Sequence, residues 1–428
     1  MKHLGGHVAL HNTFDRRTAL RLSGFGAAAW LTRVADLLAV ESEHAPQGEP
    51  ARSIILLWMA GGPSQLETFD PHAGRSIAGG TRSIRTSVKG IELAEGLPRL
   101  AEQMDKIAIV RSLTSKEGDH ERGTYLLKTG YRPDPTVIHP SIGAISCHEL
   151  PHGGTEIPRH VSILPGRWPA RGGMLGDKYD AFLVGDPAEK VPDVTSPVSS
   201  ERLAERIEAL DIVERAFSRG RSGQVEATRH RATVEQARGM MASEQLAAFD
   251  IQQEPHAVRE AYGDTPFGRA CLAARRLTEV GVRCVEVTLD GWDSHANNHE
   301  VHRELVATLD PAIAALLADL HQRDQLRQTL VLCGGEFGRT PRINPLGGRD
   351  HWPHGFSYVL AGGGVRGGQA IGQTDPEGGS EVDQPHDVAD IHATALAALG
   401  INPLKENISP AGRPIKLSEG QVIRPLLG

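Results

Sequence analysis

The chain has 428 residues and a mass of 46.1 kDa, which suits one large domain or two modest ones. Hydrophobic residues make up 39% of it and charged residues 23%, a composition that excludes an intrinsically disordered chain. The net charge of −7 argues against nucleic acid as a partner, because nucleic-acid-binding surfaces are basic. The 20 histidines, against 5 tyrosines and 9 phenylalanines, invite a search for a metal site, since histidine is the commonest metal ligand.

The N-terminal segment has the pattern of an export signal. Arg16 and Arg17 precede a weakly apolar stretch, rich in Gly and Ala, that ends at Leu31. A twin arginine before a modest apolar region is typical of bacterial twin-arginine signals, and Arg33 ends the run too early for a transmembrane span of roughly 20 residues. We therefore predict that residues 1–50 are an export signal and spacer, which would direct the protein to the periplasm or cell envelope. An amphipathic N-terminal helix is the alternative.

From residue 51 onward, short apolar runs alternate with amphipathic helical patterns. Runs that are apolar on both faces are typical of strands in a parallel sheet covered by helices, and such runs occur at 54–59, 107–110, 161–164, 282–289, 329–333 and 356–361. Helices are predicted over 203–217, 267–277, 299–320 and 387–399. The alternation predicts an α/β fold, a three-layer α/β/α sandwich with a mostly parallel central sheet. We expect residues 51–428 to form a single domain with a helical excursion around 200–265.

Polar residues gather where these strands are expected to end, which is where α/β sheets bind their ligands. One cluster follows the strand that ends at Leu289, another follows Cys333, and a third leads into the run that starts at Phe356. Together they offer six potential metal ligands: Asp293, His295, Glu336, Asp350, His351 and His354. Mixed carboxylate and imidazole ligands favour zinc or manganese, with magnesium or calcium as alternatives. A hydrogen-bonded loop network without metal would also explain the clusters.

Other polar residues are expected at the same edge of the sheet. Asp119 and His120 follow the second strand and could serve as ligands, as an acid–base pair, or simply as the solvated start of a helix. Arg339 could hold an anionic substrate or pair with a nearby carboxylate. His299 and His302 are predicted on the solvent-facing side of the helix that begins near them.

Four sequence blocks together resemble a known family. They are GGPSQLETFDP, GWDSHANN, GGEFGRTP and GRDHWPH, and their combination is similar to the exported bacterial family called domain of unknown function 1501. The resemblance covers about residues 50–400. That family is placed in the alkaline-phosphatase-like superfamily, so the resemblance implies an alkaline-phosphatase-like fold. It also implies metal-dependent hydrolysis of small anionic substrates, either phosphate or sulfate esters.

The resemblance also assigns roles to individual residues. Asp293 and His295 match the ligand pair that precedes the long helix, and His351 or His354 matches the later histidine of the same metal site. The superfamily's other metal site has two ligands at adjacent positions, and Glu336 falls at the first of them. In this chain the second position is the phenylalanine that follows. The resemblance therefore implies that one metal site is intact and that the other is altered.

The position of the superfamily's nucleophile is altered as well. In the superfamily, the nucleophile precedes a helix that ends in Leu-Thr-Gly, and this chain has Leu-Lys-Thr-Gly ending at Gly130. Counting back from Gly130 places His120 at the position of the nucleophile. The chain has no Cys-x-Pro-Ser-Arg motif, so a formylglycine sulfatase mechanism is not supported. We expect a hydrolase in which His120 and Asp119 handle protons and Arg339 holds the anion. The alternative is a non-catalytic exported module that a metal stabilises.

Overall fold

The computed structural model describes residues 49–192, 194–220 and 230–427. These residues belong to one compact unit, Pro46–Gly428. The predicted export signal lies outside the described residues except for its last two positions, and its role stays a prediction. None of the helices in the described part of the chain has the length and apolar character needed to cross a membrane.

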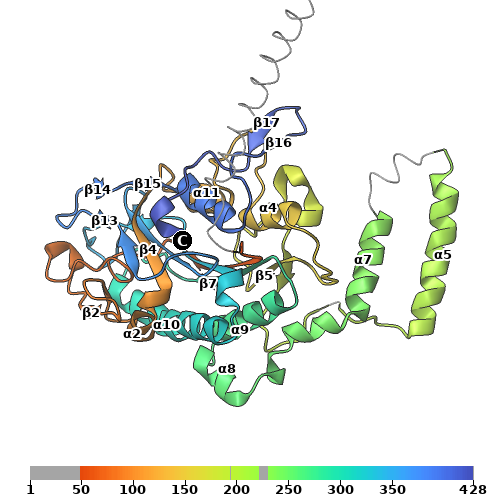
Figure 1. Ribbon diagram of the computed structural model, residues 1–428, viewed down its shortest axis with the longest axis horizontal. Coiled ribbons are helices and arrows are strands. Elements are labelled where there is room, and N and C mark those ends of the chain that lie inside the picture. Colours follow the sequence, from red (N-terminus) through yellow and green to blue (C-terminus); the bar gives the residue numbers. More distant parts are fainter. Residues whose placement is uncertain (1–48, 193, 221–229, 428) are drawn as a thin grey trace, which may run out of the picture. The chain divides into compact units, whose positions relative to one another are not determined.

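The core of the unit is a nine-stranded sheet in the order β12-β4-β11-β8-β1-β7-β5-β6, with β15 also paired to β4 (Figure 1). Its strands are β1 Ser53–Ala60, β4 Ile107–Thr114, β5 His160–Ile163, β6 Phe182–Val184, β7 Cys284–Asp290, β8 Thr329–Gly334, β11 Phe356–Ala361, β12 Gln369–Ile371 and β15 His386–Asp387. Every pairing is parallel except the two that β11 makes with β4 and β8. The predicted mostly parallel sheet is therefore confirmed.

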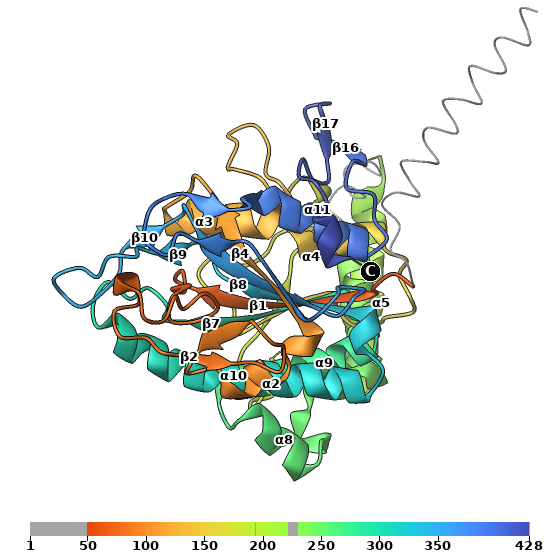
Figure 2. The same ribbon diagram turned by 60° about the vertical axis from the view of Figure 1, so that its left-hand side comes forward.

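Helices cover both faces of this sheet. Figure 2 shows α9 and α10 below it and α3, α4 and α11 above it. Along β1, Ile55 and Leu57 pack into the core on one side, while Ile54 and Leu56 pack into a second core on the other. Because both faces are buried, the strand is an uninterrupted apolar run rather than an alternating one. The predicted three-layer α/β/α arrangement is confirmed.

The predicted helices are present with small changes at their ends. The α-helices of the described residues are α2 Pro98–Glu102, α3 His120–Thr129, α4 Ile142–Glu149, α5 Ser200–Ser218, α7 His230–Ala242, α8 His256–Tyr262, α9 Pro266–Glu279, α10 Asn298–Gln322 and α11 Val388–Ala398. Local signals explain where they start: the Thr265 hydroxyl accepts from the Gly268 backbone N–H, and Pro266 occupies the first turn of α9. The segment predicted to be helical around 200–265 contains α5, α7 and α8.

Short antiparallel pairs connect the loops around the sheet. They are β2 Ser83–Arg85 with β3 Glu92–Ala94, β9 Gly338–Arg339 with β10 His351–Trp352, β13 Gln373–Thr374 with β14 Val382–Asp383, and β16 Glu406–Ile408 with β17 Pro414–Lys416. The β9–β10 pair matters most for the site, because it places His351 opposite Arg339. Since β11 runs against its neighbours, the residues that precede it lie at the same edge as the residues that follow β1, β7 and β8.

Candidate metal centre

Four segments meet at the carboxyl edge of the parallel strands. Asp293 and His295 follow β7, Glu336 follows β8, His351 precedes β11, and His120 begins α3. Strands β8, β1 and β7 are adjacent in the sheet, so the loops that leave them are neighbours. Residues that lie far apart in the sequence therefore share one site. Asp293 and His295 are exposed, so solvent and a substrate can reach the site.

The end of β1 allows these loops to approach closely. Gly61 has a φ of 115°, and a Cβ added there would lie 2.5 Å from the backbone nitrogen of Asp293. Its backbone N–H donates to Glu336 Oε1 at 3.0 Å. A larger residue at Gly61 would therefore be strained and would push the loop after β7 away from the site.

The side chains of three histidines converge on Asp293. The Nε2 atoms of His295 and His351 lie 3.0 Å apart, and they lie 3.1 and 3.3 Å from Asp293 Oδ1. His120 Nε2 lies 3.3 Å from the other oxygen, Oδ2, of the same carboxylate. Atoms of His120, Asp293 and His351 are close enough to bind one ion together.

The second nitrogen of each ring shows where its proton lies. His295 Nδ1 is 2.8 Å from Asp350 Oδ1, His351 Nδ1 is 2.7 Å from the backbone oxygen of Gly118, and His120 Nδ1 is 2.7 Å from Glu336 Oε1. A carbonyl oxygen can only accept, and so can an ionised carboxylate, so each Nδ1 is the donor. In the neutral imidazole the Nε2 atom then carries a lone pair.

This arrangement fits a divalent metal ion. The Nε2 lone pairs of His295 and His351 face each other and Asp293 Oδ1, and neither ring places a proton between them. Tetrahedral ligands at bond lengths of about 2.0–2.1 Å are separated by about 3.3 Å, close to the distances between these three atoms. Oriented Nδ1–H groups bonded to a carboxylate or carbonyl are also what metal-binding histidines require. His295 thus joins His120, Asp293 and His351 as a residue that could hold the ion.

The electrostatic surroundings give these groups different charges. Burial would raise the pKa of Asp293, but the hydrogen bond and charge of Arg339, together with the histidines, lower it to about 2, so this carboxylate stays ionised. Burial lowers the pKa of His351, which favours the neutral form that binds metal. The hydrogen bond from His120 to Glu336 raises the pKa of His120 despite its burial. The site therefore combines an anion, a neutral imidazole and an imidazole that takes up a proton readily.

Arg339 is committed to the protein itself. Its side chain is fully buried and donates to the backbone oxygens of Gly61, Gly62 and Arg349 and, at 2.6 Å, to Asp293 Oδ1. Of the two roles considered for Arg339, the structure favours pairing with a carboxylate. These contacts use four of its five N–H donors, and its expected role in holding the anionic substrate stays a prediction.

Two further predicted ligands lie behind the centre. Asp350 accepts from His295, and Glu336 accepts from both His120 and the Gly61 backbone. These contacts indicate that both carboxylates orient histidine rings. The second oxygen of Glu336, Oε2, is buried and has no hydrogen-bond partner among the described residues.

Two predicted residues do not join the group. His354 is exposed and packs edge-on against Trp352, with ring centroids 4.9 Å apart. The Asp119 carboxylate accepts from the Arg122 backbone N–H at 3.1 Å and so caps α3. Of the alternatives for Asp119, the helix start is the one its contacts support.

His302 corrects the prediction of a solvent-facing helix surface. It is buried, its Nδ1 donates to the Asn298 backbone oxygen at 2.9 Å, and its Nε2 accepts from the Ser64 backbone N–H at 2.8 Å. Burial lowers its pKa to about 4, so the ring is neutral. His299 is half-buried, with Nδ1 3.3 Å from Glu67 Oε1. Backbone partners such as Gly118 carry no side-chain signal, so sequence patterns could not have found them.

Comparisons with known proteins agree with the resemblance of the four blocks. The family model described as "Protein of unknown function (DUF1501)" matches residues 51–427. No similar sequence was found among curated proteins.

Several solved structures are also similar to this chain. The alkaline phosphatase from the Antarctic bacterium TAB5 has a TM-score of 0.39 and 14% identity, covering 83% of this chain and 100% of that chain. A sulfatase from Pseudoalteromonas sp. has a TM-score of 0.35 and 13% identity, covering 86% of this chain and 70% of that chain. A protein in the alkaline phosphatase superfamily from Vibrio parahaemolyticus has a TM-score of 0.34 and 12% identity, covering 83% of this chain and 69% of that chain. Such TM-scores are too low to support an argument about activity.

Proposed function

The chain belongs to the DUF1501 family, and from its site we propose that it is a metal-dependent hydrolase of phosphate or sulfate esters. The observation that carries this proposal is the convergence of the His295 and His351 Nε2 lone pairs on the ionised Asp293. Zinc or manganese suits this mixed donor set best. A divalent ion bound there would polarise an ester oxygen and lower the pKa of a bound water.

The protein's own residues would orient the centre and move protons. Asp350 and the Gly118 carbonyl hold the rings of His295 and His351, so their lone pairs stay aimed at Asp293. Glu336 holds His120 in the same way, so its Nε2, 3.3 Å from Asp293 Oδ2, would be the nitrogen that exchanges a proton. His120 would take a proton from the attacking water and return it to the leaving alcohol.

The attacking group would be water rather than a side-chain hydroxyl. The resemblance places His120 at the position of the superfamily's nucleophile, and the groups that converge on Asp293 carry no hydroxyl or thiol. Phe337 packs against the His120 ring at a centroid distance of 5.1 Å and against His351 at 4.5 Å, which shields both imidazoles from water on that side. A neutral His120 is a competent base, whereas covalent transfer to its nitrogen is the competing route.

The proposal is tested on the purified full chain by metal analysis and by turnover of 4-nitrophenyl phosphate, bis(4-nitrophenyl) phosphate and 4-nitrophenyl sulfate. We expect a stoichiometric divalent metal and hydrolysis of at least one ester. His295→Ala should lose both, because it removes a converging lone pair. The matched control is His354→Ala, which removes an exposed histidine of the same edge and should retain both.

The other outcomes separate the alternatives. Bound metal without turnover of any ester, together with a large thermal destabilisation by a chelator, would support a non-catalytic module that the metal stabilises. A chain that binds no divalent metal would overturn both versions.

We also propose that the protein is exported through its twin-arginine segment. The support is the sequence pattern at Arg16 and Arg17. A double Arg16→Lys, Arg17→Lys variant should remain in the cytoplasm of the expressing bacterium, while the unchanged chain reaches the periplasm or envelope. Equal distribution of both chains between the fractions would contradict export by this route.

A further inference from the structure

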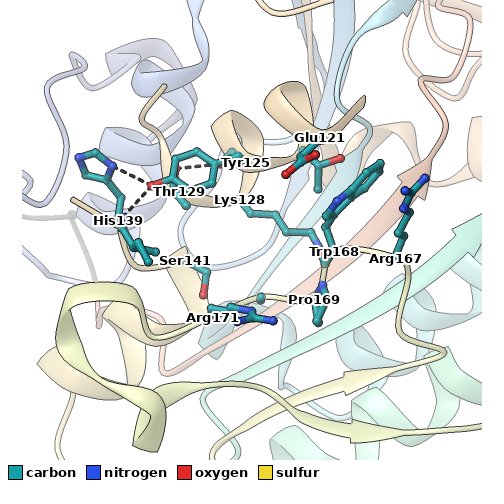
Figure 3. Close-up of a pocket in the computed structure, with 13 residues that line it drawn as sticks. Glu121, Tyr125, Lys128, Thr129, His139, Ser141, Arg167, Trp168, Pro169 and Arg171 are labelled. Carbon is teal, nitrogen blue, oxygen red and sulfur yellow. Dashed lines mark hydrogen bonds between the residues drawn. The ribbon is translucent and has the colours of Figure 1, made fainter. Parts of the chain in front are cut away.

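A separate cavity of about 290 Å³ lies between α3 and the loop that follows β5. Figure 3 shows His139 and Ser141 at one end of it and Glu121, Trp168 and Arg167 at the other. Its volume is at the small end of the range for ligand pockets, enough for one or two sugar-sized rings.

The cavity adjoins the candidate metal centre. His120 is the first residue of α3, and Glu121, Thr124 and Lys128 of the same helix line the cavity. On the other side, the loop after β5 packs against β7, since a Cβ at Gly166 would lie 3.5 Å from the Thr288 side chain. The strand β7 ends at Asp290, shortly before Asp293. A ligand in the cavity would therefore lie next to the helix end that carries the proposed proton-transfer group.

The free charge in the cavity is positive. Arg167 and Arg171 are exposed lining residues, and neither makes an ion pair with any residue that the structure describes. The Arg167 guanidinium lies 5.0 Å from the centroid of the Trp168 ring. Glu121 is the single unpaired carboxylate of the lining. Two unpaired cations against one carboxylate favour an anionic ligand.

The third cation belongs to the floor of the cavity. Lys128 is buried, and its Nζ donates to Glu286 Oε1 at 2.8 Å and to the Trp168 backbone oxygen at 2.7 Å. Glu286 neutralises this charge, so Lys128 does not add to the free charge of the cavity. The bond to the Trp168 backbone fixes the loop against α3, which gives the cavity a rigid wall.

The remaining lining groups suit a ring that carries hydroxyls. Trp168 supplies an aromatic surface against which the C–H groups of a sugar ring can pack. The Thr124 hydroxyl has no hydrogen-bond partner within the described part of the chain, and the Ser141 hydroxyl accepts from the Ala144 backbone N–H but keeps its own proton to donate. With the Glu121 carboxylate, these groups can both donate to and accept from sugar hydroxyls.

We propose that this cavity binds an acidic sugar unit, with its ring on Trp168 and its anionic group on Arg171. Bidentate guanidinium contacts recognise carboxylate, sulfate and phosphate groups alike. Binding of the sugar in this cavity does not depend on the proposed function. The further inference that this sugar is the organic part of the hydrolysed ester rests on the proposed function.

Calorimetric titration of the full chain, with and without chelator, tests the proposal. The probes are glucuronic acid, glucose 6-sulfate and glucose 6-phosphate, with glucose as the neutral control and inorganic sulfate as the anion-only control. At least one acidic sugar should bind about tenfold more tightly than either control, also in the metal-free protein. Trp168→Ala and Arg171→Gln should each weaken that binding about tenfold. Arg366→Gln, an exposed arginine away from the cavity, should not change it.

The remaining outcomes are distinguishable. If no acidic sugar binds, or if inorganic sulfate binds as tightly, the cavity is not an acidic-sugar site and the proposal is overturned. Ester turnover in that case would leave the proposed function intact, whereas sugar binding without any turnover would refute the proposed function alone. Trp168→Phe keeps an aromatic surface and should retain most of the binding, which separates loss of stacking from misfolding. Unfolding temperatures of all variants complete the comparison.

Discussion

Two histidine environments in this protein differ in what their second ring nitrogen faces. In both His302 and His351, Nδ1 donates to a backbone oxygen. The Nε2 of His302 accepts from the Ser64 backbone N–H, so the ring is satisfied without a ligand. The Nε2 of His351 instead faces the Nε2 of His295, and neither of these two nitrogens carries a proton in the neutral rings. Residue type does not separate a core histidine from a metal ligand, but the partner of the second nitrogen does.

The largest effect should come from breaking the buried ion pair between Arg349 and Glu67, the carboxylate whose charge acts on His302. Arg349 is fully buried and donates from two nitrogens to Glu67 Oε1, at 2.9 and 3.1 Å. Arg349→Met would leave the buried Glu67 without its cation and should lower the free energy of unfolding by about 3–5 kcal/mol. Urea denaturation of the variant and the unchanged chain measures this difference in the free energy of unfolding. Metal content per folded molecule should stay unchanged, and Arg366→Met is the surface control. A loss of metal would instead show that the Arg349–Glu67 pair and the metal centre are coupled.

Acid should destabilise the protein through its buried neutral histidines. The pKa of His302 and of His392 is lowered by burial to about 4, whereas an unfolded histidine titrates near 6.5. Between these values the unfolded chain binds protons that the folded chain does not, so stability is full above about pH 6.5 and falls toward pH 4. The expected loss is about 3 kcal/mol for each residue.

Denaturant titrations at several pH values, in the presence of chelator, measure that slope. His392→Gln should reduce the total loss by the share of one buried histidine, about 3 kcal/mol, without touching the metal centre. An unchanged slope in this variant would mean that His392 is not buried in its neutral form.

A smaller effect is expected at the residue that orients His295. Asp350 is exposed, and its hydrogen bond with His295 lowers the pKa of Asp350. Asp350→Ala should reduce metal affinity about 10–100-fold while changing stability by less than about 0.5 kcal/mol. Competition with a chromogenic chelator measures the affinity, and Asp383→Ala, another exposed carboxylate, is the control. Undiminished affinity would argue against His295 as a ligand.

The smallest effect should follow removal of the α3 cap. Asp119→Ala should cost about 1 kcal/mol of stability, because it removes the acceptor for the Arg122 backbone N–H. Turnover should stay within about twofold, since Asp119 does not contact the converging histidines. A loss of about 100-fold in kcat at unchanged stability would instead restore an acid–base role for this residue.

Local patterns predicted much of the architecture. Because β1, β7 and β8 are buried on both faces, they appear as continuous apolar runs, and helices such as α10 carry a regular apolar stripe. The rule that ligands bind beyond the carboxyl ends of strands then pointed to Asp293, His295 and His351. These predictions needed only residue types and their spacing, and the four sequence blocks placed the chain in its family.

The tertiary structure decided what each polar group does. It set the antiparallel direction of β11, which carries His351 to the edge that Asp293 occupies. It buried His302 and committed Arg339 to backbone oxygens and Asp293. The physical reason is that the role of an imidazole or guanidinium depends on which donors and acceptors surround it. Those partners, such as the Gly118 carbonyl that orients His351, come from distant parts of the chain and are often backbone atoms.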